Sequence, residues 1–303
     1  MITRLILNGK KAGQEDVRAA VYSLRASGHN LEVRTTWEGG DVERLVKEAV
    51  AENITRIIAG GGDGTVNEVT NALFKHQANH IELAILPLGT ANDFASACEI
   101  PIEPISALEL AINGDSYWVD SARANDMYFI NIATAGFGAQ VTATTPVALK
   151  DLLGGGAYTL SGLVQAIKFE PFAGKVTTDG IEKRANIVVG AVCNGRTAGG
   201  GQPLAPRAYI DDGLLDTFSI EAFGAADVPK VIEELNQDQV LNEPIYIKRA
   251  QATKIDWLST NIMPINLDGE PISVHQVTIE VVPNSVKLVL PSHTQVLLNR
   301  KKA

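Results

Sequence analysis

The hydrophobic and polar positions of the first 90 residues alternate between two periods. Short apolar runs of strand length occur at Thr3–Leu7, Leu31–Thr35, Arg56–Ala59 and Glu82–Leu86. Between them, apolar residues recur every three or four positions, which is typical of helices with one buried face. These helical stretches are Asp16–Ser27, Asp41–Glu52, with Asp41 as the expected cap, and a third that begins after Thr65. The alternation predicts a parallel sheet with helices on both faces.

The pattern changes after one more helical stretch, Pro101–Asn113, and short strand-like runs predominate from Tyr117 onward. Asn125-Asp126 is a hairpin turn between two such runs. Gln140–Lys168 is rich in Ala, Leu and Gly and is expected to be helical. The later strand-like runs are Lys175–Thr178, Ala185–Cys193, Leu214–Ile220, Ile245–Trp257, Ile262–Leu267, Val274–Val282 and Val286–Leu290, interrupted by a helical stretch at Ala225–Leu235. Asp-Gly pairs at 179, 212 and 268 separate strand-like runs. An antiparallel sandwich or barrel is expected.

The predicted fold is therefore an α/β domain of Rossmann-like type followed by a mainly β domain, with the boundary near residue 124. In parallel sheets of this kind, ligands bind beyond the carboxyl ends of the strands. Three polar loops are expected at that edge: Thr35–Gly40, Gly60–Thr65 and Gly89–Asp93.

Composition narrows the class of protein. A net charge of −9 disfavours a general nucleic-acid binder. Two distant cysteines, Cys98 and Cys193, argue against a disulfide framework and suit a reducing cytosol. The five histidines lack the spacing of metal ligands. No apolar run reaches the ~18 residues of a spanning helix, and the chain enters its first strand without a signal peptide, so we expect a cytoplasmic protein.

The strongest local signal is RIIAGGGDGTVNE, Arg56–Glu68, which predicts a strand, a glycine turn and a helix. Backbone N–H groups at such a turn form a cradle for an anion such as phosphate. The loop lacks the Gly-Lys-Ser/Thr of a P-loop, and Thr65 stands where the dinucleotide fingerprint needs glycine. A simple tight turn is the alternative reading. Asp63 is explained either by a divalent cation on a nucleotide or by a turn-capping role.

Three further motifs have both a chemical and a structural interpretation. In PLGTANDFA, Gly89 and Thr90 can present N–H and hydroxyl groups to a nucleotide, while Asn92 is equally an N-cap. Asp212, in DDGLLD, is either part of a hairpin turn or the carboxylate of a cation loop completed by main-chain carbonyls. Glu270 follows an Asp-Gly turn and is either a solvated glutamate or a catalytic one.

Taken together, GGGDGTVNE, PLGTANDFA, DDGLLD and LDGEP, in this order and spacing, resemble the diacylglycerol-kinase catalytic superfamily. ILNGK, VRTTWEGGD and CNGRTAGGGQ make the chain more similar still to the bacterial YegS-type lipid kinases. The resemblance covers essentially the whole chain. GGDGT alone is shared with sphingosine, ceramide and NAD kinases, whereas the full set of motifs is much more specific.

The resemblance implies an ATP-binding α/β domain over 1–124, a β-sandwich lipid-acceptor domain over 125–284, and a C-terminal segment, 285–303, that packs back on the first domain. It also implies site residues. The expected ATP contacts are Thr36, the loop residues Gly62, Asp63, Gly64, Thr65, Val66, Asn67 and Glu68, and Thr90. Mg²⁺, or Ca²⁺ at the same site, is expected on the Tyr209 carbonyl, the Asp212 carboxylate and the Leu214 carbonyl. Glu270 is the expected proton acceptor, with Asp63 and Asp268 in reserve for metal or nucleotide contacts.

The resemblance therefore predicts a phosphotransferase that moves the γ-phosphate of ATP to a hydroxyl of a glycerolipid such as diacylglycerol or phosphatidylglycerol. Its expected partners are ATP and a lipid at a membrane surface, reached from the cytoplasm by peripheral contact at the inner membrane. Apolar residues at Leu152-Leu153, Tyr158 and Phe169–Phe172 are either core or part of that contact. Two alternatives stand beside this reading: an NAD kinase-like enzyme, and a nucleotide- or metal-binding regulatory protein without catalysis.

Overall fold

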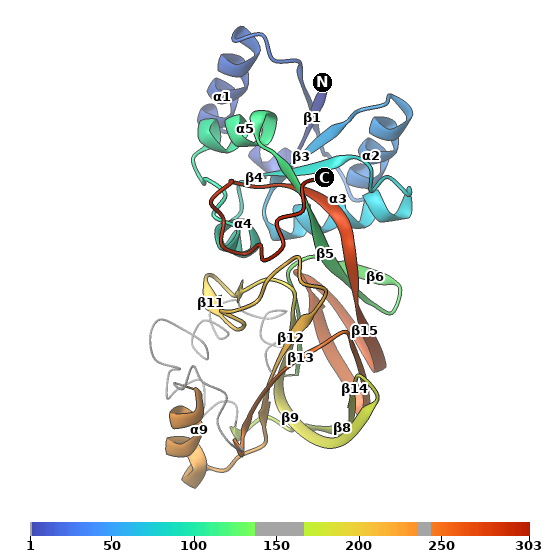
Figure 1. Ribbon diagram of the computed structural model, residues 1–303, viewed down its shortest axis with the longest axis vertical. Helices are drawn as coiled ribbons and strands as arrows, with labels where there is room; N and C mark the ends of the chain where they lie inside the picture. The colour runs from blue at the N-terminus through green and yellow to red at the C-terminus, as the bar shows by residue number, and fades with distance from the viewer. Residues whose placement is uncertain (1, 137–166, 236–243) are drawn as a thin grey trace. The chain divides into compact units, whose positions relative to one another are not determined.

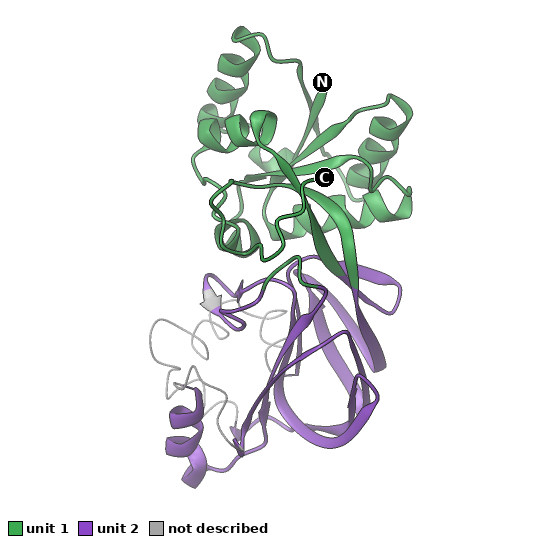
Figure 2. Ribbon diagram, viewed as in Figure 1, with its two compact units in different colours: residues 1–121, 209–212, 282–303 green, residues 122–208, 213–281 purple. Residues whose placement is uncertain are grey.

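A computed structural model describes residues 2–136, 167–235 and 244–303 (Figure 1). The chain forms two compact units (Figure 2). The first consists of 1–121, 209–212 and 282–303, and the second of 122–208 and 213–281. The predicted helical stretch 140–168 lies almost wholly outside the described residues, as do Leu152-Leu153 and Tyr158. Across the described ranges, no helix is both long and apolar enough to span a membrane.

The first unit alternates strands and helices as the apolar pattern predicts. Its elements are β1 (Thr3–Leu7), η1 (Gly9–Lys11), α1 (Glu15–Ala26), β2 (Leu31–Thr35), α2 (Asp41–Ala51), β3 (Arg56–Gly61), α3 (Asp63–Lys75), β4 (Glu82–Pro87), α4 (Asp93–Ala97) and α5 (Pro104–Asn113). Two helix starts differ from prediction. Helix α3 begins at Asp63, two residues before Thr65. Helix α5 begins only at Pro104, because Glu103 caps it by accepting the Ser106 N–H.

The strands of the first unit form a sheet in the order β4-β3-β1-β2, and each neighbouring pair is parallel. The end of β15 (Glu270–Val289) adds to β4, also in parallel. Helices α1 and α5 pack beside each other on a core that includes Leu5, Ile58 and Leu86, and α2 packs beside α3 (Figure 1). Because side chains alternate along a strand, the two helix pairs cover opposite faces of the sheet.

Ion pairs between buried arginines and half-buried glutamates hold the amino ends of the parallel strands together. Arg4 is fully buried on β1 and pairs with Glu32, its register partner on β2, at 2.6 Å. Arg56 on β3 pairs with Glu82 on β4 at 2.7 Å and also donates to the Ala111 carbonyl at the end of α5. Charged pairs therefore stabilise this edge, and the polar loops lie at the opposite, carboxyl edge.

The C-terminal segment belongs to the first unit and is anchored by side-chain hydrogen bonds. The buried Asp211 carboxylate accepts the backbone N–H groups of Leu298, Asn299 and Arg300. The Thr294 hydroxyl donates to the Cys98 carbonyl at 3.0 Å. Since Asp211 belongs to the short insert 209–212, this insert and the C-terminal segment fold together.

The second unit is built mainly of antiparallel strands. Its elements are the end of β5 (Ser116–Ala124), β6 (Met127–Phe129), β7 (Ile132–Gly136), β8 (Phe172–Thr178), β9 (Ile181–Cys193), β10 (Thr197–Ala198), β11 (Gln202–Pro203), β12 (Leu215–Glu221), η2 (Ala225–Asp227), α9 (Val228–Leu235), β13 (Ile247–Ala252), β14 (Lys254–Leu267) and most of β15. The predicted run 245–257 is divided at Thr253, whose N–H donates to the Asp179 carboxylate. The predicted runs 274–282 and 286–290 are one strand, β15.

The main sheet of this unit has the order β13-β12-β9-β7-β14-β15, and β8 also lies between β9 and β14. Strands β7 and β8 thus lie one after the other between β9 and β14, each pairing with a different part of these two strands. Two Asp-Gly turns close hairpins with positive φ at both residues: Asp179 and Gly180, at 46° and 85°, and Asp268 and Gly269, at 49° and 104°. These are the values of the hairpin turn that Asp-Gly favours.

Two apolar clusters flank this sheet. One, which includes Trp257, Ile265 and Ile279, lies on one face, and the other lies against α9. Phe172 is buried in the first cluster and Phe169 packs against both, with their rings 5.6 Å apart. Phe172 therefore belongs to the core, and Phe169 is half-buried against it, which favours the core interpretation of these two residues.

Candidate active site

The two predicted nucleotide loops of the first unit touch through glycine backbones. A Cβ on Gly89 would lie 2.6 Å from the Cα of Gly62, and one on Gly62 would lie 3.0 Å from the Cα of Gly89. Real Cβ contacts are not this short, so any larger residue would separate the loop after β3 from the loop after β4. The glycines here serve the close approach of two loops that follow adjacent parallel strands.

Gly64 has a different reason to be glycine. It lies in the first turn of α3, its φ is not positive, and a Cβ there would meet no atom within 4 Å. Neither packing nor backbone strain in the described residues requires glycine at this position. The first backbone N–H groups of a helix have no intrahelical partner and attract anions. Open space beside them is what a phosphate cradle needs.

Asp63 links the two glycine loops. Its carboxylate accepts the backbone N–H groups of Asp93 at 3.3 Å and Phe94 at 3.2 Å, at the start of α4. Burial raises the pKa of Asp63, and the nearby charge of Asp93 raises it further, while the N–H of Phe94 opposes the shift. Of the two sequence interpretations of Asp63, the structure shows a capping interaction, made with the neighbouring helix.

The loop after β2 is held just as firmly. The Thr36 hydroxyl accepts the Gly9 N–H at 3.1 Å. Asp41 does not cap α2 as predicted; its carboxylate turns back to accept the N–H groups of Trp37 at 2.6 Å and Glu38 at 3.1 Å. The Trp37 N–H, followed by Arg44 and the Glu38 N–H, lowers the pKa of Asp41 from its ordinary 3.8 to about 2.

Asn92 occupies the N-cap position of α4, but its side chain stabilises the Gly89–Asn92 turn. It adopts a left-handed conformation with φ 52°, and its side chain makes no cap bond. Its amide accepts the Gly89 N–H at 2.8 Å and donates to the Gly89 carbonyl at 3.0 Å. Thr90, in the same turn, is exposed to solvent.

The remaining predicted nucleotide residues differ in accessibility. The side chains of Thr65, Val66 and Asn67 are buried in the fold, whereas Glu68 is exposed. Thr65 also accepts a hydrogen bond from the Asn8 amide at 3.4 Å, which ties the loop after β1 to α3. Thr65, Val66 and Asn67 can therefore contribute to a ligand mainly through the backbone and through packing of the first turn.

The predicted cation loop, 209–214, contains two acids with different environments. Asp211 is buried and bonds the C-terminal segment. Asp212 is half-buried, and Gly213 after it has φ 77°. Among the described residues no cluster of three His, Cys, Asp or Glu side chains is placed to hold a metal. A cation at this loop would thus need main-chain oxygens such as those of Tyr209 and Leu214.

Glu270 and Asp268 lie on the β14–β15 hairpin of the second unit. Glu270 begins β15 directly after the turn and is exposed. Asp268 is buried, and its carboxylate accepts the N–H groups of Ile130, Asn131 and Ile132 at 2.7 to 3.1 Å. Asp268 thus anchors the hairpin to the start of β7 and leaves Glu270 accessible at its tip.

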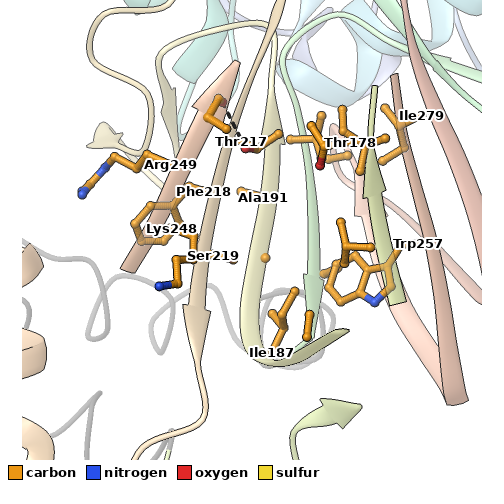
Figure 3. A pocket seen from close by; sticks show the side chains of 18 of the residues that line it. Thr178, Ile187, Ala191, Thr217, Phe218, Ser219, Lys248, Arg249, Trp257 and Ile279 are labelled. Atoms are coloured by element: carbon orange, nitrogen blue, oxygen red, sulfur yellow. Dashed lines mark hydrogen bonds between the residues drawn. The ribbon is translucent and has the colours of Figure 1, made fainter. Parts of the chain in front are cut away.

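The second unit also contains a large pocket that the sequence did not reveal. Its volume is about 570 Å³, within the range of small-molecule sites. The apolar part of its wall comprises Val176, Ile187, Val192, Ile255, Trp257, Ile265, Val277 and Ile279. Figure 3 shows Lys248 and Arg249 on one side, Trp257 and Ile279 on the other, and Ala191 between them.

Polar groups interrupt this apolar wall at few places. The exposed cations Lys183, Arg184, Lys248 and Arg249 belong to the lining, and the Arg249 guanidinium lies over the Phe218 ring at 5.2 Å. The Trp257 Nε1 is buried and has no hydrogen-bond partner among the described residues. The pocket therefore combines an apolar interior, exposed cations and a buried donor. No short motif signals it, because its residues come from seven strands that are far apart in the sequence.

Comparison with known proteins follows the same division of the chain. Residues 3–124 match the model of the diacylglycerol kinase catalytic domain, and residues 131–290 match the YegS C-terminal NAD kinase beta sandwich-like domain. A protein of Shewanella frigidimarina described as a probable YegS-like lipid kinase is 49% identical, over 97% of this chain and 96% of that protein. One of Chromohalobacter salexigens with the same description is 42% identical, over 97% and 95%.

The fold is also similar to solved structures. The crystal structure of a diacylglycerol kinase from Bacillus anthracis superposes with a TM-score of 0.73 at 25% identity, covering 97% of this chain and 98% of that one. The match extends over both units of the chain.

Proposed function

The chain belongs to the YegS-like lipid kinases with a diacylglycerol kinase catalytic domain, and from this membership we propose that it transfers the γ-phosphate of ATP to a free hydroxyl of a glycerolipid. Kinases of this family are phosphotransferases with an alcohol acceptor. The observation that carries the proposal is the cradle at α3: two glycine loops in backbone contact, and a helix N-terminus with open space at Gly64.

The nucleotide is proposed to bind at the carboxyl edge of the parallel strands, in the Rossmann-like manner. The backbone of Gly62–Glu68 would hold the phosphates at the start of α3, where the Gly64 N–H faces open space. The N–H groups of Thr65 and Val66 already donate to the Gly62 carbonyl, at 2.9 and 3.2 Å, and hold the turn in shape. Thr36 and Thr90 lie on the flanking loops at the same edge. Gly64 supports this assignment most directly, since nothing described in the fold requires glycine there.

Mg²⁺ is the proposed cation, held by the Asp212 carboxylate and the carbonyls of Tyr209 and Leu214, with Ca²⁺ as an alternative occupant. An oxygen-only donor set of this kind suits hard cations. The use of Asp211 by the C-terminal segment supports Asp212 as the acid of the pair that serves the ion. When bound, the cation offsets phosphate charge.

Glu270 is the proposed proton acceptor. Its exposed position on a tight hairpin, fixed by the three backbone bonds of Asp268, leaves the carboxylate available to a substrate hydroxyl. As the acceptor oxygen forms its bond to the γ-phosphorus and the bond to the β-γ bridging oxygen breaks, the hydroxyl proton passes to Glu270 and ADP leaves. A carboxylate is sufficient because phosphoryl transfer depends on orientation more than on a strong base.

The pocket of the second unit is the proposed site of the acyl chains of the acceptor. Its apolar wall suits hydrocarbon, and the unpaired Trp257 N–H could donate to an ester carbonyl of a glycerolipid. The exposed cations Lys183, Arg184, Lys248 and Arg249 support contact with an anionic membrane surface from the cytoplasm, although the chain as a whole is acidic. Diacylglycerol and phosphatidylglycerol are both candidate acceptors.

The test is incubation of the purified protein with γ-labelled ATP, Mg²⁺ and a panel of diacylglycerol, phosphatidylglycerol and NAD⁺, followed by identification of the labelled product. Label on a glycerolipid, lost in the Glu270→Gln variant, supports the proposal. Label on NAD⁺ would establish the NAD kinase-like alternative. Nucleotide binding without transfer to any acceptor would favour the regulatory alternative.

A further inference from the structure

Trp37 of the first unit has an exposed aromatic side chain on a backbone that hydrogen bonds hold in place. The Trp37 side chain is 95% exposed. Single exposed apolar residues are common and by themselves mean little. What sets Trp37 apart is its backbone, which is fixed on both sides: the Thr36 N–H donates to the Leu7 carbonyl at 3.0 Å, and the Trp37 N–H donates to Asp41 at 2.6 Å.

Register in the sheet locates this loop relative to the glycine cradle. Leu7 on β1 pairs with Thr35 on β2 and with Gly60 on β3, so Thr35, the last residue of β2, is level with Gly60, the last but one of β3. They lie two strand spacings apart, which is roughly 10 Å. Trp37 lies two residues beyond Thr35, and Gly62 lies two residues beyond Gly60. A ribose and an α-phosphate can bridge a separation of this size.

The loop after β1, which contains Asn8 and Gly9, connects the Trp37 loop to the glycine loop through hydrogen bonds. The Gly9 N–H donates to the Thr36 hydroxyl, and the neighbouring Asn8 donates its N–H to the Gly60 carbonyl at 2.8 Å and its amide to Thr65. Hydrogen bonds thus tie the loop that carries Trp37 to the first turn of α3. The backbone that carries the indole is therefore held at a fixed place along the edge that carries the glycine loop of α3.

We infer that Trp37 stacks on the purine base of the nucleotide donor and forms the base-binding part of the site; this rests on the proposed function. An indole ring offers a flat apolar face to a base, and stacking recognises any base, because each has a π-face. Trp37 therefore contributes affinity for nucleotides and little selectivity between adenine and guanine. It contributes nothing to the binding of a triphosphate without a base.

The experiment compares Trp37→Ala and Trp37→Phe with the parent protein in calorimetric titrations with Mg-ATP, Mg-GTP and inorganic tripolyphosphate. Trp37→Ala should bind ATP and GTP roughly tenfold or more weakly, the scale of a lost base–aromatic stack, and tripolyphosphate as the parent does. Trp37→Phe should recover most of the affinity. ATP should quench the tryptophan fluorescence of the parent more than that of Trp37→Phe.

Tyr22→Ala is the matched control, because Tyr22 is also an exposed aromatic of the first unit, at 61%, but lies on α1. Its affinities should equal those of the parent. Equal ATP affinity of Trp37→Ala and the parent would overturn this inference and leave the proposed function standing. A parallel loss of tripolyphosphate binding in Trp37→Ala would also overturn it, since the loop and not the stack would then be responsible. A parent that binds neither ATP nor tripolyphosphate would overturn both.

Discussion

The two units present their candidate functional residues in different ways. In the first unit these residues lie on loops that follow the ends of parallel strands, and each loop is fixed by a few specific contacts, such as the Gly62–Gly89 approach and the Asp63 and Asp41 carboxylates. In the second unit the pocket is lined by many residues from seven strands, and no single loop forms it.

This difference has a physical consequence for mutation. A loop held by few contacts changes abruptly when one contact is removed, so single substitutions should have large and specific effects. In a pocket lined by many side chains, each side chain contributes a small part of the binding free energy. Each substitution should therefore have a small effect that depends on the size of the ligand. Glu270 is the exception in the second unit, because it is a single exposed group at the tip of a hairpin.

The largest effect of a substitution on activity is expected at Glu270. Glu270→Gln should keep ATP affinity near the parent value while the transfer rate falls by roughly 10²-fold or more, the scale of a lost general base. Glu270→Asp should retain part of the rate, since its carboxylate is set back by one methylene. Single-turnover transfer to a lipid acceptor, with nucleotide affinity measured separately, tests this.

Glu182→Gln provides the control, because Glu182 is an exposed glutamate just past the other Asp-Gly hairpin turn. Its transfer rate should not change. If Glu270→Gln transfers phosphate at the parent rate, the second unit contributes no proton acceptor at this hairpin. Glu270 would then not be the single residue of the second unit whose substitution has a large effect.

The next effect separates two reasons for glycine within the first unit. Gly64→Ala should leave thermal stability unchanged or slightly higher, because the Cβ meets no atom and alanine favours a helix. The same change should weaken ATP binding by roughly tenfold, by placing a methyl group in the cradle. Gly89→Ala should instead lower the free energy of unfolding by about 1–3 kcal/mol, because its Cβ collides with Gly62. Thermal melts and ATP titrations distinguish the two.

If the Gly64→Ala variant binds ATP with the affinity of the parent, the phosphates do not bind at the first turn of α3. A fully stable Gly89→Ala variant would show that the two loops can separate without cost. Either result would mean that the loops of the first unit depend less on single contacts than we infer from the structure.

A smaller effect is expected in the pocket. Ala185→Leu adds three carbon atoms to a partly buried lining position and should raise the KM for a long-chain diacylglycerol by about fourfold to tenfold. A short-chain acceptor should be affected less, because it leaves part of the pocket free. Ala173→Leu, at an exposed position of the neighbouring strand β8, is the control and should behave as the parent. Equal effects on long and short acceptors would remove the pocket from acyl-chain binding.

The same contrast explains what the sequence could predict. Periodicity located the strands and helices of the first unit within a few residues, because each has a buried face of regular spacing. The glycine motifs pointed to the loops that the structure brings together. The partners of the loop carboxylates were not predictable: Asp63 caps α4 and Asp41 binds Trp37, because tertiary contacts decide which N–H groups face a carboxylate.

In the second unit, hairpin turns were predicted from Asp-Gly pairs, but strand lengths were not. Strand β15 continues through Pro283 and Asn284, where the sequence suggested a break, and the N–H of Asn284 donates to the buried Asp120. The pocket was missed for a related reason. Its lining depends on how strands far apart in sequence are ordered in the sheet, and no local pattern contains that order.

The smallest expected effect concerns Asp41, a buried residue whose carboxylate fixes the Trp37 loop. Its folded pKa, about 2, lies below its ordinary 3.8, so the charged form is the one that the native loop favours. The resulting stabilisation is fully present above the ordinary pKa and is lost as the pH falls from about 4 to about 2. Asp41→Asn keeps the shape of the side chain but removes this charge at every pH.

The stability difference between the parent and Asp41→Asn should therefore be constant from about pH 5 to pH 8 and should shrink steadily below about pH 4. Denaturant unfolding at a series of pH values measures it, and Glu38→Gln, which changes a charge in the same loop, should show no such profile. Because Asp41 bonds the Trp37 backbone, Asp41→Asn should also weaken ATP binding slightly, and less than Trp37→Ala does. A stability difference that persists unchanged at pH 2 would mean that the loop depends on the shape of Asp41 and not on its charge.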